Sequence, residues 1–146
     1  MNPRRLDWRA VESRLVRIGE LLDTLHERGE IDGQRLGDDE LLALAVERIL
    51  TLVVDLAFSV NSHVAVAELG RAPDSYAASF PMAADAGLIT SELAAALRPS
   101  AGTRNVLVHG YLDIDHAQVA AAIPLALRDY REYIHQAARW MRDRSG

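Results

Sequence analysis

The sequence predicts an all-α fold, an up-and-down bundle of four long helices and one short helix. Apolar residues recur every three or four positions along nearly the whole chain, and no alternating strand pattern of useful length occurs. With 49% hydrophobic and 25% charged residues, the composition is typical of a globular protein. The length of 146 residues and the lack of internal repeats or an interdomain linker predict that residues 1–146 form a single domain.

The first two long helices are predicted from stripes of apolar residues. The first helix should stop by Gly29, and a loop rich in Gly and Asp is expected from there to Gly37. The second helix begins at Asp38 or Asp39, either of which can cap its free N–H groups, and runs to about Gly70. The stripe of the first helix is Val11, Leu15, Ile18, Leu22 and Leu25, and that of the second is Leu42, Ala45, Ile49, Leu52 and Leu56.

Three polar residues, Asp55, Asn61 and His63, lie in the apolar second half of the second helix. Polar groups that are buried need hydrogen-bond partners. We therefore expect a buried hydrogen-bonded cluster, with a contribution to a functional cleft as the alternative. The helix is also expected to be long enough to face another chain as well as its own core.

A short helix and a third long helix are expected before the last one. The short helix covers residues 79–86, and Thr90 or Ser91 then caps the next helix. Pro99 and Gly102 fall within that helix, so a break or kink is expected there before helical spacing resumes.

The last long helix has the clearest start signal. Asp115 and Gln118 fit a capping arrangement in which the second side chain reaches back to the first residue. Pro124, one turn inside, is expected to bend the helix. The apolar stripe of this helix consists of Val119, Ile123, Leu127, Tyr130 and Ile134.

Composition excludes several kinds of chemistry. All 16 basic residues are Arg, so a lysine Schiff base and a Walker-type phosphate lysine are excluded. The chain has no Cys, which excludes disulfides and thiolate chemistry. Its five His residues lack metal-ligand spacing, so we expect neither a metal nor a cofactor. With a net charge of −5, contact with a nucleic acid should be local.

No segment is typical of a signal peptide or a membrane span. The most apolar stretch, residues 49–67, is interrupted by polar side chains. We therefore expect a cytoplasmic protein with no membrane contact.

Two further features concern the ends of the chain. Residues 4–17 carry five Arg and two acidic residues, and residues 128–146 carry five Arg and three acidic residues. If the terminal helices pack together, they form one basic strip for an RNA backbone, although two solvated helix faces are somewhat favoured. Trp8 and Trp140 are expected to be packing residues rather than platforms for base stacking.

The segment from Arg104 to Tyr111 concentrates side chains that can act on a phosphodiester. Arg104 offers a permanent cation whose planar fork matches phosphate oxygens, and His109 can take or give a proton near neutral pH. On a regular helix these two point about 140° apart. Either a distorted last turn at Gly110 or a two-fold dimer that joins two copies of the segment would bring them together.

This segment resembles the R-x4-H-x-Y motif of the HEPN superfamily, in its HepT-like (DUF86) branch, with Asn105 as the polar residue after the Arg. The resemblance implies a HEPN-like helical bundle. It extends over most of the chain, through Glu47-Arg48-Ile49-Leu50, Asn61-x-His63, Pro73-Asp74-Ser75-Tyr76 with Phe80, and Ile114-Asp115.

The resemblance implies a homodimeric, metal-independent endoribonuclease that acts as a toxin of a type VII toxin–antitoxin system. By this resemblance Arg104 holds the scissile phosphate, His109 is the acid–base residue, and Asn105 orients the phosphate or the His. The expected products are a 2′,3′-cyclic phosphate and a 5′-hydroxyl. The implied partner is an MntA-like nucleotidyltransferase antitoxin, which transfers AMP to the motif tyrosine, here Tyr111.

Two alternatives stay open at this stage. One is a non-catalytic module that binds a nucleotide or pairs with a minimal nucleotidyltransferase. The other is a helical interaction domain without an active centre, which would tolerate substitution of Arg104 and His109.

Overall fold

The computed structural model describes residues 6–110 and 112–145, and these residues form seven helices and no strand. The all-α class is therefore confirmed. The helices are α1 (Trp8–Glu27), α2 (Gly33–Asp38), α3 (Glu40–Leu69), α4 (Tyr76–Asp85), α5 (Ser91–Leu97), α6 (Pro99–His109) and α7 (His116–Ser145).

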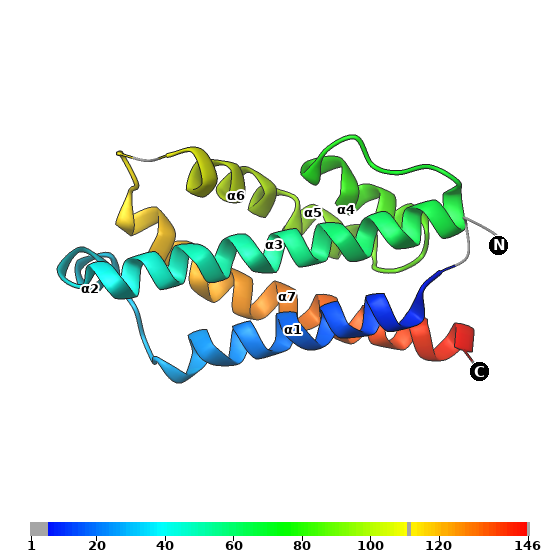
Figure 1. Ribbon diagram of the computed structural model, residues 1–146, viewed down its shortest axis with the longest axis horizontal. Coiled ribbons are helices and arrows are strands. Elements are labelled where there is room, and N and C mark those ends of the chain that lie inside the picture. Colours follow the sequence, from blue (N-terminus) through cyan, green and yellow to red (C-terminus); the bar gives the residue numbers. More distant parts are fainter. Residues whose placement is uncertain (1–5, 111, 146) are drawn as a thin grey trace.

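The three long helices run up and down and form the body of the bundle. α1 packs against both α3 and α7, while α4 and α6 pack on the opposite side of α3, as Figure 1 shows. α3 therefore lies between the α1–α7 pair and the shorter helices. With 30 residues it extends about 45 Å, so a single rigid element supports most of the others.

The predicted helix ends at α3 and α7 are confirmed by their caps. The Asp39 carboxylate accepts a hydrogen bond from Leu42 N at 3.1 Å, and Gly70 ends the helix with a φ of 75°. At the start of α7, Asp115 Oδ1 accepts hydrogen bonds from the backbone N–H groups of the two residues that follow His116.

The structure departs from the predicted element boundaries in two places and confirms a predicted break. The second half of the expected loop is the short helix α2, because Asp32 caps it at Arg35 N (2.8 Å) and Leu36 is fully buried. α4 starts three residues earlier than predicted, since Ser75 Oγ accepts from Ala78 N at 3.0 Å. The predicted break at Pro99 divides the third long helix into α5 and α6.

The polar residues within α3 do not form the single buried cluster that the sequence predicted. Asn61 is fully buried, where its amide donates to Ser79 Oγ at 3.1 Å and its Oδ1 accepts from the Tyr133 hydroxyl at 2.6 Å. His63 instead contacts the Ser59 carbonyl through Nδ1 at 2.7 Å. Asp55 lies nearer the start of α3 and contacts neither of them. Polar residues at different positions of one helix face different neighbouring elements.

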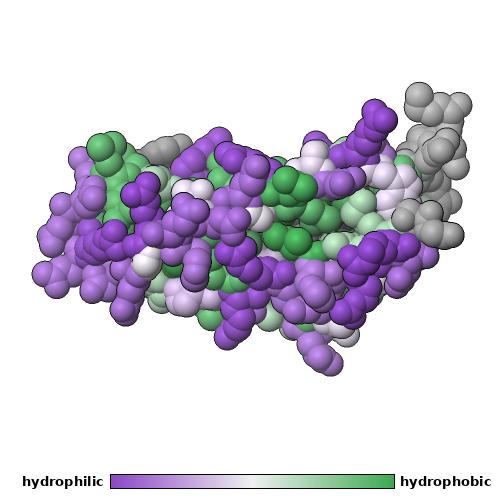
Figure 2. Space-filling view, turned by 90° about the horizontal axis from the view of Figure 1, so that it is seen from below, coloured by the Kyte–Doolittle hydropathy of each residue, from purple (hydrophilic) through white to green (hydrophobic). Residues whose placement is uncertain are grey.

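The two ends of the chain lie side by side on the α1–α7 pair. Trp8 and Trp140 pack with their ring centroids 6.0 Å apart, which confirms that they are packing residues. Arginines of this region are interspersed with acidic partners, as in the ion pair between Arg131 and Asp23 at 2.9 Å. Figure 2, which looks onto the side of α1, shows a mostly hydrophilic face interrupted by apolar areas.

The membrane prediction can be compared with the helices directly. Within residues 6–110 and 112–145, none of the helices combines the length and the apolar character needed to cross a bilayer.

We predict that Tyr133→Phe lowers the free energy of unfolding by about 1–3 kcal/mol, because the buried Asn61 Oδ1 loses its donor. Urea denaturation of the purified protein measures this difference. Tyr130→Phe is the matched control, since its partner Ser100 keeps a hydrogen bond to the Leu97 carbonyl (2.6 Å). An equal loss in the two variants would contradict the proposed role of the Asn61 contact.

Alkaline pH is expected to destabilise the fold through the same two tyrosines. Burial raises the pKa of Tyr130 and that of Tyr133 above the ordinary value of 10.0. Below about pH 10 both the folded and the unfolded chain keep these protons, so no pH dependence arises from them. Above it the unfolded chain binds fewer protons, and the free energy of unfolding should fall by about 1.4 kcal/mol per pH unit for each tyrosine.

Urea denaturation between about pH 9 and pH 11 measures this slope. Each single Tyr→Phe variant should show a shallower slope than the parent protein. A slope that neither variant changes would contradict the assignment to these tyrosines.

Candidate functional site

The candidate site residues lie on α6, an 11-residue helix whose two ends are set by its sequence. Pro99 occupies the first turn, where the missing N–H costs nothing. Gly110 ends the helix and donates to the Val106 carbonyl at 2.7 Å. A Cβ at Gly110 would lie 2.7 Å from the Val106 oxygen and 3.1 Å from Ile114 Cδ1, so this close approach requires glycine.

Arg104 is the most restrained side chain of the site. Its Nε donates to Asp55 Oδ1 at 2.8 Å, and its Cζ lies 4.3 Å from the centroid of the Tyr76 ring. The Arg104 side chain is 18% exposed and that of Asp55 is 31% exposed. Arg104 thus forms an ion pair across α3 and α6 together with a cation–π contact to α4.

The Tyr76 hydroxyl belongs to the same arrangement. Partial burial raises the pKa of Tyr76 above 10.0, and the Asp55 carboxylate raises it further, while Arg104 acts in the opposite direction. Tyr76 therefore remains a neutral phenol at physiological pH. Its ring also stacks on Phe58, with the centroids 4.2 Å apart.

Asn105 and His109 are both exposed and lie one turn apart on α6. The Asn105 side-chain oxygen is 3.4 Å from Arg104 Nη1, which is a long hydrogen bond. His109 is the last helical residue, so Gly110 ends the helix without moving His109 off it. The structure brings Arg104 and Asn105 together, whereas His109 points to a different side of the helix. Tyr111 lies outside the described residues.

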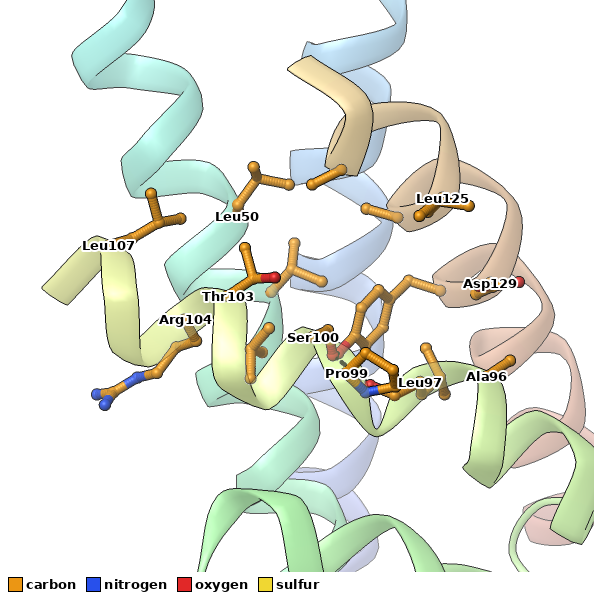
Figure 3. A pocket seen from close by; sticks show the side chains of 15 residues that line it. Leu50, Ala96, Leu97, Pro99, Ser100, Thr103, Arg104, Leu107, Leu125 and Asp129 are labelled. Atoms are coloured by element: carbon orange, nitrogen blue, oxygen red, sulfur yellow. Dashed lines mark hydrogen bonds between the residues drawn. The ribbon is translucent and has the colours of Figure 1, made fainter. Parts of the chain in front are cut away.

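Beside the site, a small apolar cavity of about 90 Å³ lies between α3, α6 and α7. Leu50, Leu107 and Leu125 line it together with the base of Arg104. Figure 3 shows the guanidinium pointing away from this cavity. The guanidinium thus contacts Asp55 of α3 and Tyr76 of α4 rather than the cavity, and the cavity belongs to the packing between helices.

Sequence reasoning missed Tyr76 as a member of this site, and it gave Asp55 a place in a functional cleft only as the alternative to a buried cluster. A signal existed for Asp55, since an acidic residue in an apolar helix segment needs a partner, but nothing in the sequence identified Arg104 as that partner. In the described part of the chain, no three His, Asp or Glu side chains group closely enough to hold a metal ion.

Comparisons with known proteins agree with this fold. A family model described as Ribonuclease HepT-like matches residues 11–137. A curated relative, the tRNA nuclease HepT of Aphanizomenon flos-aquae (strain 2012/KM1/D3), is 35% identical over 127 residues, 86% of each chain.

Two solved structures resemble the whole chain. One is a tri-AMPylated HEPN toxin of Shewanella oneidensis in complex with an MNT antitoxin, with a TM-score of 0.78, 22% identity, and coverage of 95% of this chain and 99% of that one. The other is YutE of Bacillus subtilis, described as a cytosolic protein of unknown function, with a TM-score of 0.82, 19% identity, and coverage of 95% and 93%. At these identities the likeness concerns the fold alone.

Proposed function

The chain belongs to the HepT-like ribonuclease family, and from this premise we propose that it is a metal-independent endoribonuclease, the toxin of a type VII toxin–antitoxin pair. The substrate is RNA, and tRNA is the first candidate because the 35% identical relative is a tRNA nuclease. In this proposal residues 1–146 form one HepT-like domain, and the protein works in the cytoplasm, where tRNA is found.

The main support for the proposal is that the Arg104 guanidinium is held in place beside an exposed polar face of α6. Arg104 is held by Asp55, and Asn105 and His109 are accessible on the same helix. Such a cation stabilises the charge that develops on a phosphate in the transition state. His109, the last residue of α6, supplies an imidazole, the side chain most often used in acid–base catalysis.

The reaction proposed is an internal transfer at the phosphate. The ribose 2′-oxygen attacks the adjacent phosphorus while its proton passes to one imidazole, and the bond from phosphorus to the 5′-oxygen breaks. A second imidazole gives a proton to the leaving 5′-oxygen. The products are a 2′,3′-cyclic phosphate and a 5′-hydroxyl, with Arg104 on the non-bridging oxygens and Asn105 orienting the phosphate or the imidazole.

A homodimer completes this site in the proposal. In one chain Arg104 and His109 point in different directions, and two copies of α6 about a two-fold axis supply two guanidiniums and two imidazoles. The outer side of the motif carries exposed apolar residues, with Val106 56% exposed and Leu112 93% exposed. Exposed apolar side chains next to His109 favour contact with a second copy of this segment.

Regulation is proposed to come from an MntA-like nucleotidyltransferase antitoxin that transfers AMP to Tyr111. AMP adds bulk and negative phosphate charge next to the motif. It would therefore compete with RNA for the Arg104 guanidinium.

We predict that cleavage of tRNA survives EDTA and falls by about 1000-fold or more in Arg104→Ala and in His109→Ala. Gel analysis of end-labelled tRNA measures the rate, and resistance of the 3′ ends to ligation until the cyclic phosphate is opened and the resulting monophosphate is removed identifies the product. Arg48→Ala on the same bundle is the control and should cleave normally. Cleavage that requires a divalent ion, or full activity in both variants, contradicts the proposal.

The dimeric site is tested with the same two variants. Co-expressed Arg104→Ala and His109→Ala chains form mixed dimers in which the intact Arg104 and His109 come from different copies. Partial recovery of cleavage is expected if one site uses both copies. Proven mixed dimers that stay inactive would contradict a shared site in which one Arg104 and one His109 from different copies support cleavage.

We predict that co-expression with the cognate nucleotidyltransferase raises the mass of the protein by whole multiples of one AMP unit. Intact mass spectrometry measures the gain, which should be lost in Tyr111→Phe and kept in Tyr76→Phe, the matched control. Loss of activity without any mass gain would instead favour blocking by direct contact with the antitoxin. Nucleotide binding without RNA turnover would favour a non-catalytic binding module.

A further inference from the structure

Two side chains outside the motif restrain the Arg104 guanidinium. Asp55 on α3 accepts from Nε at 2.8 Å, and the Tyr76 ring on α4 lies over the guanidinium, 4.3 Å from Cζ. Phe58 supports the Tyr76 ring from behind, at 4.2 Å between centroids. Because three helices converge on it and only 18% of the side chain is exposed, Arg104 has far fewer orientations than a surface arginine.

These restraints determine which part of the guanidinium faces a ligand. Asp55 occupies the Nε edge and Tyr76 covers one face. Nη1 also makes a long hydrogen bond to Asn105 Oδ1, at 3.4 Å, and the Tyr76 hydroxyl interacts with Arg104 as well as with Asp55. The two Nη atoms therefore form the available edge, and this edge binds phosphate oxygens in a bidentate manner.

We propose that Asp55 and Tyr76 are positioning residues of the ribonuclease, which hold Arg104 so that its Nη edge meets the scissile phosphate. The inference rests on the proposed RNA cleavage. Ordering a long side chain costs conformational entropy, and here that cost is met on folding rather than in the transition state. A cation fixed in advance stabilises developing charge without reorganisation.

The Asp55 carboxylate has a second consequence for binding. A negative charge 2.8 Å from Nε partly neutralises the cation that attracts RNA. Asp55 thus weakens the attraction of RNA in the ground state while it orients the group that acts in the transition state. Substitution of Asp55 should therefore move KM and kcat separately, which a purely structural role would not do.

The central test is Asp55→Asn, which keeps the shape of the side chain and removes its charge. We expect kcat for tRNA to fall by about tenfold, less than the hundredfold that a misplacement of about 1 Å costs. KM should stay the same or fall by about twofold, because Asn lacks the negative charge that Asp55 places beside the phosphate site. Single-turnover and steady-state cleavage of tRNA by the full-length protein separate the two constants.

Glu68→Gln is the matched control. Glu68 also lies on α3, its side chain is 28% exposed, and it pairs with Arg144 at 2.9 Å, so it resembles Asp55 in everything except its distance from α6. It should leave kcat and KM unchanged. A kcat within about twofold of the parent value in Asp55→Asn, or an equal loss in Glu68→Gln, overturns the proposal.

The aromatic restraint is tested by a pair of variants. Tyr76→Phe keeps the ring under Arg104 and should retain most of kcat, whereas Tyr76→Leu removes the ring and should lower kcat by several-fold. Equal kcat values in the two variants would overturn the role of the ring. Urea denaturation of each variant excludes a loss that merely follows unfolding.

A spectroscopic readout does not depend on cleavage. The Nε–H group of Arg104, assigned by its absence in Arg104→Lys, should give a slowly exchanging NMR signal in the parent protein and lose that protection in Asp55→Asn. Arg104→Ala separates the two hypotheses. If Arg104→Ala cleaves normally, the proposed function fails; if only Arg104→Ala is inactive while Asp55→Asn cleaves normally, the positioning role fails.

Discussion

The ion pair between Asp55 and Arg104 links the stability of the bundle to its candidate chemistry. Asp55 stands in an apolar segment of α3, and its carboxylate needs a partner because α4 and α6 cover much of it. Arg104 of α6 is this partner, with its Nε 2.8 Å from Asp55 Oδ1. Removing either partner leaves a partly buried charge unpaired, which costs more than the pair itself contributes. The orientation of the cation therefore follows from the packing of α6 on α3.

Contacts with α3 position most of the other helices. Over 30 residues it presents Asp55 to α6 and, farther along, Asn61 to Ser79 of α4 and Tyr133 of α7. Asp55 and Asn61 each have specific partners on neighbouring helices, so the helices around α3 have one register rather than several of similar energy. The spacing of α4 and α6 along α3 is what brings Tyr76 over the Arg104 guanidinium. A site on short helices gains its rigidity from one long helix.

The sequence predicted best those features that depend on neighbouring residues. Caps such as Asp39 and Asp115, and the end of α3 at Gly70, are set by hydrogen bonds or backbone geometry within a few positions. The short helix α2 was not expected, because its stability comes from the buried Leu36 and hence from tertiary packing. The pairing of Asp55 with Arg104 joins positions 49 apart in the chain. No local pattern identifies such a partner.

The geometry of α6 separates the two side chains on which the proposed reaction depends. The helix remains regular through His109, and a regular helix directs positions five apart to sides about 140° apart. Arg104 faces α3 and α4, whereas His109 faces outward, and the glycine that follows ends the helix without turning His109 inward. The inner contacts of Arg104 and the outer position of His109 are therefore two consequences of one regular helix. In the proposed reaction an outward imidazole beside exposed apolar residues meets a guanidinium only across an interface, so the arrangement that restrains Arg104 favours the proposed homodimer.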